Sequence, residues 1–335
     1  MKGRYEIIVK NARIQYKFSI ARNITILRGD SATGKTTLID MILQHQISGD
    51  QSGIEVRSDK TCTVLQAINW QLILPTIHDS IVFIDEGGRD EKNQHFVCSA
   101  AFADAVQHSD NYYVIATRAN LFNLPYSVQE IYGIRNVSGN RYQKTKRLYS
   151  AFYPLYRSQP ELSMSPDLVI VEDSNAGYDF FASYFASYNI RCLSAAGKSN
   201  IVKVLRDENY RTALIIADGA AFGSEVSIVL ALQKARSFML YMPESFEWLV
   251  LKADLLHDKS IREILSDPSE YIESKDYFSW ERFFTALLTE RSRGSWLQYS
   301  KRSLNRNYIQ PSVMEQIAQI MPAALQTPTN YTAEE

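Results

Sequence analysis

Apolar and polar positions alternate in the N-terminal part of the chain with the period of short β-strands. The alternation covers residues 5–10, 12–20 and 23–29, and polar turns separate these stretches. Over residues 35–46 the apolar positions recur instead at helical spacing. We therefore predict an antiparallel pair of strands, a third strand, a loop and a helix, in that order.

Continuous apolar runs follow further along the same half of the chain. Residues 80–86 ("SIVFIDE") and 111–118 ("NYYVIATR") are typical of central strands that are buried on both faces of a parallel sheet. Residues 93–107, between these runs, have helical character. Strands that alternate with helices predict a parallel α/β sheet domain over residues 1–145.

The residue composition changes after this domain. Residues 146–165 are polar, basic and aromatic, and we interpret them as a linker. Apolar strands alternate with helices again over residues 166–245, which predicts a second, smaller α/β domain. Residues 246–325 favour a helical C-terminal region, and residues 326–335 have the character of a loose tail.

The composition of the chain bears on whether it binds nucleic acid, a membrane or a structural metal. The 335 residues include 36 basic and 37 acidic side chains, so the net charge of -1 gives no general attraction to nucleic acid or to a membrane. No apolar run is long enough for a membrane span, and we expect a cytoplasmic protein without membrane contact. Cys62, Cys98 and Cys192 lack the spacing of a zinc module, and we interpret them as reduced, buried residues.

The loop between the third strand and the first helix carries "GDSATGKT", which fits GxxxxGK[ST] at every fixed position. Glycines let the backbone turn its N–H groups toward a phosphate, and the helix start adds the positive end of its dipole. Lys35 would contact the β- and γ-phosphates, and Thr36 would hold Mg²⁺. The predicted nucleotide-binding residues are Gly29, Asp30, Ser31, Ala32, Thr33, Gly34, Lys35, Thr36 and Thr37.

This motif resembles the Walker A loop of P-loop NTPases, and "IVFIDE" resembles their Walker B strand. Consecutive carboxylates are similar to those of the additional-strand ATPases, and the lack of an NKxD motif favours ATP over GTP. The resemblance implies that Asp85 reaches Mg²⁺ through water and that Glu86 deprotonates the attacking water, with Lys35 completing the catalytic set. The alternative is that Asp85 and Glu86 only end the strand as solvent-exposed carboxylates without a catalytic role.

Two residues at the end of the run "YYVIAT" extend this resemblance. Thr117 and Arg118 occupy the place where many such NTPases have a polar sensor of the γ-phosphate. The alternative is a surface arginine after a strand.

Strands that end in acids recur in the second domain. "LVIVED" ends at Glu172 and Asp173, and "ALIIAD" ends at Asp218. Strand ends of an open parallel sheet line a shared crevice, and Mg²⁺ prefers carboxylate oxygens. The arrangement resembles a TOPRIM domain, in which a glutamate and paired aspartates hold a divalent metal for phosphodiester chemistry. The resemblance implies Glu172 and Asp218 as metal ligands.

The second domain departs from the TOPRIM pattern at one position. That family has D-x-D where this chain has Asp218-Gly219-Ala220, and the loss of the second acid weakens the case for catalysis. The alternative is a Rossmann-like domain whose strand-end acids cap the following helices. We interpret Glu244 and Glu247 as helix-start residues, with an approach to the crevice as the alternative.

Two further stretches are candidates for anion binding. Residues 289–308 combine basic side chains with Trp296, Tyr299 and Tyr308, a mixture that can follow a phosphate backbone and stack on bases. The alternative is an ordinary basic and aromatic surface. Gly197-Lys198-Ser199, at a helix start, is a hypothetical second phosphate site.

A P-loop ATPase domain followed by a TOPRIM-like domain is the order found in OLD-family ATPase-nucleases, and the chain resembles a compact member of that group. We predict an ATPase with ATP and Mg²⁺ as cofactors, whose nucleotide state controls a second domain that binds or acts on nucleic acid, as in a defence-type effector. The aromatic stripes of the C-terminal region are typical of a core or a subunit interface, and we expect a homo-oligomer.

The alternative is an ATP-dependent regulatory or assembly module. Its second domain would be non-catalytic and would bind a protein partner or a small anion. Ala220, in place of the second acid, favours this alternative.

Overall fold

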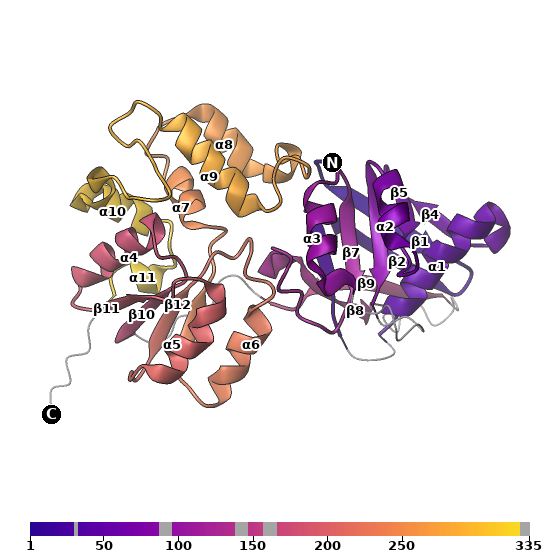
Figure 1. Cartoon of the computed structure of the whole chain (residues 1–335), viewed down its shortest axis with the longest axis horizontal. Helices are drawn as coiled ribbons and strands as arrows, with labels where there is room; N and C mark the ends of the chain where they lie inside the picture. Colours follow the sequence, from indigo (N-terminus) through magenta and orange to yellow (C-terminus); the bar gives the residue numbers. More distant parts are fainter. Residues whose placement is uncertain (30–32, 87–95, 138–146, 157–165, 329–335) are drawn as a thin grey trace. The chain divides into compact units, whose positions relative to one another are not determined.

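The computed structural model describes residues 1–29, 33–86, 96–137, 147–156 and 166–328, and the chain divides into two compact units. Unit 1 comprises Met1–Tyr156 and Asp267–Ser279, and unit 2 comprises Arg157–Ser266 and Trp280–Glu335. Each unit combines a β-sheet with helices, so the α/β class predicted from the sequence is confirmed (Figure 1).

Unit 1 is built on a sheet whose strand order, within the described residues, is β4-β1-β2-β9-β8-β3-β7-β6-β5. The run β8-β3-β7-β6-β5 is parallel, whereas β1 is antiparallel to β2 and β4, and β9 is antiparallel to β8. The predicted N-terminal hairpin is present, but the sheet is mixed rather than parallel throughout. The strands are β1 (Tyr5–Lys10), β2 (Ile14–Ile20), β3 (Ile24–Leu27), β4 (Glu55–Arg57), β5 (Thr61–Val64), β6 (Ser80–Asp85), β7 (Tyr112–Ala116), β8 (Ile131–Asn136) and β9 (Leu148–Pro154).

Helices cover both faces of the central strands. Leu38 of α1 (Lys35–Ser48) packs in one core cluster with Phe83 and Val114, which lie on one face of β6 and β7. Phe102 of α3 (Ala100–Gln107) meets Tyr113 edge to face, and Tyr113 points to the opposite face of β7. The third helix of the unit is α2 (Trp70–Ile73). Burial on both sides explains why these strands are continuous apolar runs.

Part of the predicted linker is a strand. β9 pairs with β2 on one side and with β8 on the other, and the ring of Phe152 stacks on Phe18 at a centroid distance of 3.9 Å. The prediction of a linker over residues 146–165 is therefore wrong for β9. Polar and basic residues around it concealed a strand whose neighbours in the sheet come from distant parts of the chain.

A short segment from the C-terminal half belongs to unit 1. This segment, Asp267–Ser279, is here called the return segment. It buries Ile272 and Phe278, and it joins the start of the chain through a backbone hydrogen bond of 2.8 Å from Ser274 N–H to the carbonyl of Met1. The helical pattern predicted over residues 246–325 does not distinguish this segment from its flanks.

Unit 2 contains a parallel sheet with the order β11-β10-β12-β13. The connection from β10 to β11 runs in one direction along the sheet, and the connections from β11 to β12 and from β12 to β13 run in the other. Right-handed crossovers therefore place α4 on one face of the sheet and α5 and α6 on the other (Figure 1). The strands are β10 (Leu168–Val171), β11 (Arg191–Ser194), β12 (Ala213–Ile216) and β13 (Phe238–Tyr241). The helices are α4 (Ala176–Ala186), α5 (Ile201–Asp207), α6 (Val226–Ala231), α7 (Phe246–Lys252), α8 (Lys259–Ser266), α9 (Trp280–Arg291), α10 (Pro311–Ala318) and α11 (Ala323–Gln326).

Within the described ranges, no helix has the length and apolar character needed to cross a bilayer.

Candidate functional site

The carboxyl ends of three neighbouring strands of unit 1 meet in one row. β7 lies between β3 and β6, and its last residue, Ala116, is in register with Leu27 of β3 and with Asp85 of β6. Backbone bonds continue the pairing past the strand ends, because Glu86 N–H donates to Ala116 at 2.9 Å and Thr117 N–H donates to Leu27 at 3.2 Å. The loop after β3, the acid after β6 and the hydroxyl after β7 therefore lie at one edge of the sheet.

The loop after β3 has the backbone geometry that its glycines permit. Gly29 has φ of 137° and Gly34 has φ of 93°, both in the region that L side chains rarely adopt. The Lys35 ammonium donates to the Gly29 carbonyl at 2.8 Å and to the Thr33 hydroxyl at 2.9 Å. The side chain of Lys35 thus spans the loop from the start of α1 to the end of β3.

The remaining predicted loop residues are placed as follows. Thr36 and Thr37 are exposed in the first turn of α1. Asp30, Ser31 and Ala32 lie outside the described residues.

Tyr16 of β2 supports this loop, a role that no motif in the sequence indicates. Its hydroxyl donates to the Gly34 carbonyl at 3.0 Å, and the Tyr16 ring is buried. Burial raises the pKa of Tyr16, which keeps it a neutral donor. A Cβ at position 34 would lie 2.8 Å from this hydroxyl, so Gly34 is needed for space as well as for its φ.

Glu86 is the buried acid at this edge. Only 8% of its surface is exposed, and one carboxylate oxygen accepts a hydrogen bond from the Thr117 hydroxyl. The Cys98 thiol approaches the other oxygen at 3.8 Å. Burial and the Glu86 carboxylate raise the pKa of Cys98, which favours the protonated thiol beside the acid.

The other predicted residues near Glu86 differ in exposure. Asp85 is half-buried at the end of β6, and Arg118 is exposed. Cys98 is also exposed, so the prediction of a buried residue is wrong for it. It ends a short 3₁₀ turn (Phe96–Cys98) that precedes α3, and its side chain turns toward the Glu86 carboxylate rather than into the core.

These residues fit a triphosphate nucleotide with its magnesium ion. The loop combines positive-φ glycines with the N-terminus of a 14-residue helix, an arrangement that presents backbone N–H groups to anions. Lys35 would supply the cation for the phosphates, and the Thr36 hydroxyl and the Asp85 carboxylate would supply oxygen ligands of the kind that Mg²⁺ prefers. Glu86 is the carboxylate that the structure holds through Thr117.

Unit 2 repeats the device at the ends of β10 and β12. Glu172 N–H donates to the Ile216 carbonyl at 2.8 Å, and Asp218 N–H donates to a Glu172 carboxylate oxygen at 3.0 Å. The strand order reverses between these two strands, where open sheets form a crevice. A hollow of about 10 Å³ lies here, lined among others by Glu172, Asp173, Asp218, Glu247 and Lys301.

Lys301 provides a cation within this acidic hollow. Its ammonium forms an ion pair with Glu281 of α9 and lies 3.9 Å from the carboxylate of Glu247 on α7. Burial by itself lowers the pKa of Lys301, but the Glu281 and Glu247 carboxylates outweigh burial and the pKa is raised. The Tyr299 hydroxyl also donates to Glu247, at 2.8 Å.

The strand-end acids are harder to ionise than usual. Burial raises the pKa of Glu172 to about 7, and the Glu281 carboxylate adds to this effect. Burial, followed by the carboxylates of Glu281 and Glu172, also raises the pKa of Asp218. The alternative interpretation of Glu247 as a residue that approaches the crevice is confirmed, whereas the cap of α7 is Ser245, which accepts from Trp248 N–H.

The donor set of unit 2 does not fit the metal that TOPRIM resemblance implies. The hollow already contains the Lys301 ammonium, which is paired with Glu281 and lies 3.9 Å from the Glu247 carboxylate. Ala220, at the place of the second acid of D-x-D, is buried. Asp173 instead accepts from Gly177 N–H at 3.0 Å, as expected for an acid that caps the following helix.

The other two candidate stretches have mainly structural contacts. The Lys198 ammonium donates to the Ala221 carbonyl at 3.0 Å and lies 3.2 Å from the Ser224 hydroxyl, and so joins two loops of unit 2. Tyr299 and Tyr308 are buried, and Tyr308 donates to the Leu297 carbonyl. Trp296 is exposed, so it is the aromatic residue of stretch 289–308 that can stack on a base.

Comparisons with family models, with curated proteins and with solved structures gave no match to this chain.

Proposed function

We propose that the chain is a P-loop ATPase of the additional-strand type, in which the nucleotide state of unit 1 controls unit 2. The observation that supports this most is the convergence at one sheet edge of the Gly29 loop, Glu86 and Thr117. The position of β7 between β3 and β6 supports the additional-strand type, because β7 separates the loop strand from the acid strand.

The residues at this edge have distinct roles in the proposed reaction. Lys35 binds the terminal phosphates, and Thr36 and Asp85 hold the magnesium ion, which neutralises charge on the triphosphate. Glu86 accepts a proton from the attacking water, and the Thr117 hydroxyl fixes the orientation of this carboxylate. Burial of Glu86 limits solvent around the proton that it accepts.

The test compares two lysines that each follow a glycine. Lys35→Ala removes charge-assisted bonds to phosphate, which we expect to weaken ATP binding about 10- to 100-fold and to abolish phosphate release. Lys198→Ala is the matched control, because Lys198 contacts loop atoms within unit 2. ATP binding is measured by calorimetry with Mg²⁺, and turnover by phosphate release. Unchanged binding and turnover in Lys35→Ala would exclude the proposed nucleotide site.

For unit 2 we propose a non-catalytic, regulated role. Its acidic hollow contains the Lys301 ammonium, and Ala220 replaces the second acid, so no metal-dependent step is assigned to it. A partner protein or a small anion is the ligand class that remains from the sequence analysis. Mn²⁺-dependent cleavage of labelled DNA or RNA that Asp218→Asn abolishes would overturn this role.

Nucleic-acid binding without cleavage is the second candidate for unit 2. It is favoured by the exposure of Trp296 together with Arg293, Arg302 and Arg306. Stacking of Trp296 on a base would contribute about 1–3 kcal/mol to the binding free energy. Fluorescence anisotropy of labelled single strands tests it, since Trp296→Ala should weaken binding about tenfold or more. Equal affinity of the parent and Trp296→Ala would remove this candidate.

A further inference from the structure

The return segment links the two units through the chain itself. Unit 2 supplies α8, which ends at Ser266, and α9, which begins at Trp280, whereas residues 267–279 between them belong to unit 1. The return segment is therefore joined directly in sequence to two helices of unit 2.

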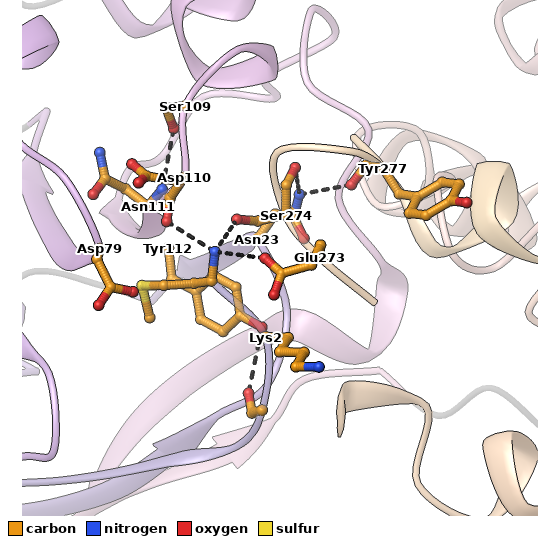
Figure 2. A network of polar contacts seen from close by, with 12 residues as sticks. Lys2, Asn23, Asp79, Ser109, Asp110, Asn111, Tyr112, Glu273, Ser274 and Tyr277 are labelled. Carbon is orange, nitrogen blue, oxygen red and sulfur yellow. Dashed lines mark hydrogen bonds and ion pairs between the residues drawn. The ribbon is translucent and has the colours of Figure 1, made fainter. Parts of the chain in front are cut away.

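Asn23 holds the return segment to the strands of the nucleotide site (Figure 2). Its side-chain amide donates to the carbonyls of Ser274 and Tyr277 at 3.2 and 2.9 Å. Its own carbonyl accepts from Tyr113 N–H of β7 at 2.7 Å, and Asn23 directly precedes β3. The amino ends of β3 and β7 thus meet the return segment, while their carboxyl ends carry the Gly29 loop and Thr117.

Further contacts fix the return segment firmly within unit 1. Gly3 N–H donates to the Ser269 carbonyl at 2.7 Å, and the Tyr112 hydroxyl of β7 donates to the Gly3 carbonyl at 3.3 Å. Only 1% of Ile272 is exposed. The segment is held by backbone bonds and a buried apolar residue, so it is expected to follow the strands rather than slide over them.

The return segment is followed directly in the chain by α9 of unit 2. Ser279 is followed by α9, and Glu281 in the first turn of α9 forms the ion pair with Lys301. The negative charge of the Glu281 carboxylate also helps to raise the pKa of Asp218 and of Glu172. A small change at the start of α9 therefore alters the charge balance of the hollow.

We propose that the return segment couples the nucleotide site to the unit 2 hollow, from β3 and β7 through Asn23 to the start of α9 and Glu281. This inference rests on the proposed function, because it needs a nucleotide that binds at the loop after β3. Nucleotide binding shifts the strand ends, Asn23 carries the shift to Ser274 and Tyr277, and α9 responds. The coupling is reciprocal, so ligands of the hollow change nucleotide affinity by the same factor.

The experiment measures hydrogen exchange in the full chain. Peptides that cover residues 267–279 and 280–291 are followed with and without a non-hydrolysable ATP analogue and Mg²⁺. In the parent protein the analogue should change exchange in both peptides by about fivefold or more, because a coupling at the lower end of the usual range would change a local opening equilibrium by that factor. Asn23→Asp replaces the amide donor with a carboxylate that faces two carbonyls. It should bind the analogue as the parent does, but α9 should lose its response.

Asn111→Asp is the matched control. Asn111 is buried at the same end of the sheet, and its side-chain amide donates to the Ile77 carbonyl at 2.7 Å. This variant should keep the response of α9. If Asn23→Asp fails to fold, Ile272→Val, which removes one methyl group from the return segment, takes its place with Ile261→Val of α8 as its control.

The outcomes separate the two proposals. A parent protein that binds no analogue overturns the proposed function and, with it, the coupling. A parent protein that binds the analogue without any change in α9 overturns the coupling alone. The coupling is also overturned if α9 responds equally in the parent and in the folded return-segment variant.

Discussion

Both units place acids at the carboxyl ends of sheet strands, but they balance the charge differently. In unit 1, the Glu86 carboxylate accepts from the Thr117 hydroxyl, and the nearby cation, Lys35, lies across the glycine loop. In unit 2, Glu172 and Asp218 line a hollow together with Lys301, whose ammonium is already paired with the Glu281 carboxylate. The same strand-end device therefore leads to two different sites.

The difference shows what each edge is suited to bind. The unit 1 edge joins a cation and backbone N–H groups to acids, which suits a phosphate together with its metal ion. The unit 2 edge already contains an ammonium among its acids, so a divalent cation would have to compete with a tethered one. We conclude that strands ending in acids indicate which edge of a sheet carries a candidate site. The cation beside those acids decides which kind of ligand the site suits.

The largest expected effect separates the acids of the two units. Glu86→Gln removes the proposed base and should lower ATP turnover about a hundredfold or more, while ATP binding is kept. Glu172→Gln makes the same chemical change at the unit 2 edge and should leave the rate of phosphate release within about twofold of the parent, because no step of hydrolysis is assigned to it. Equal turnover in the two variants would break the comparison.

A second prediction tests Lys301 as the counter-charge of unit 2. Lys301→Met leaves the Glu281 and Glu247 carboxylates without their cation, and it should lower the unfolding free energy of unit 2 by about 2 kcal/mol, a value discounted for partial exposure. Lys203→Met, at an exposed site of α5, is the control and should be nearly neutral. Urea unfolding followed by tryptophan fluorescence measures both.

The fluorescence can be restricted to unit 2. Of the four tryptophans, Trp248, Trp280 and Trp296 lie in unit 2, so Trp70→Phe serves as the parent background. A Lys301→Met protein as stable as Lys203→Met would show that the acids need no internal cation.

A third prediction concerns pH. The pKa of Glu172 is raised from 4.5 to about 7 in the folded chain, so the folded state binds a proton more tightly than the unfolded chain does. This contribution is complete below pH 4.5 and is lost as pH rises through about 7. Unit 2 should lose about 1 kcal/mol of stability across this window, after discount for solvent and coupling to Asp218. The same unfolding assay, at several pH values, should show a smaller slope for Glu172→Gln.

Much of unit 1 could be predicted from the sequence, because its information is local. The glycine spacing and the apolar run before Asp85 fall within short windows, and each predicts one element and its end. The order of strands could not be predicted, since β9 enters the sheet between β8 and β2 by long-range pairing. The return segment was missed for the same reason.

The unit 2 site was predicted only in part. Glu172 and Asp218 could be found because both follow apolar strands whose ends must converge. Lys301, which decides their electrostatic surroundings, belongs to a basic stretch that favours an exposed, nucleic-acid-binding surface. Nothing local in a sequence indicates that one lysine of such a stretch points into an acidic hollow while its neighbours point to solvent.

The smallest expected effect tests how the unit 1 loop is supported. Tyr16→Phe removes the hydrogen bond from the tyrosine hydroxyl to the Gly34 carbonyl and leaves the ring in its core. A neutral hydrogen bond of this kind contributes about 0.5–1.5 kcal/mol, so ATP affinity should fall about threefold. Calorimetry with Mg²⁺ and ATP measures it.

Tyr113→Phe is the matched control for Tyr16→Phe, since Tyr113 is also buried in the unit 1 sheet and its hydroxyl bonds Ser109 at 2.7 Å. Ser109 precedes β7 and so lies at the opposite end of the strand from Thr117, which means that this control should leave ATP affinity unchanged. An equal loss in both variants would indicate general loosening of the sheet. A loss confined to Tyr16→Phe would show that β2 positions the loop through Gly34, and that the hairpin is part of the nucleotide edge of unit 1.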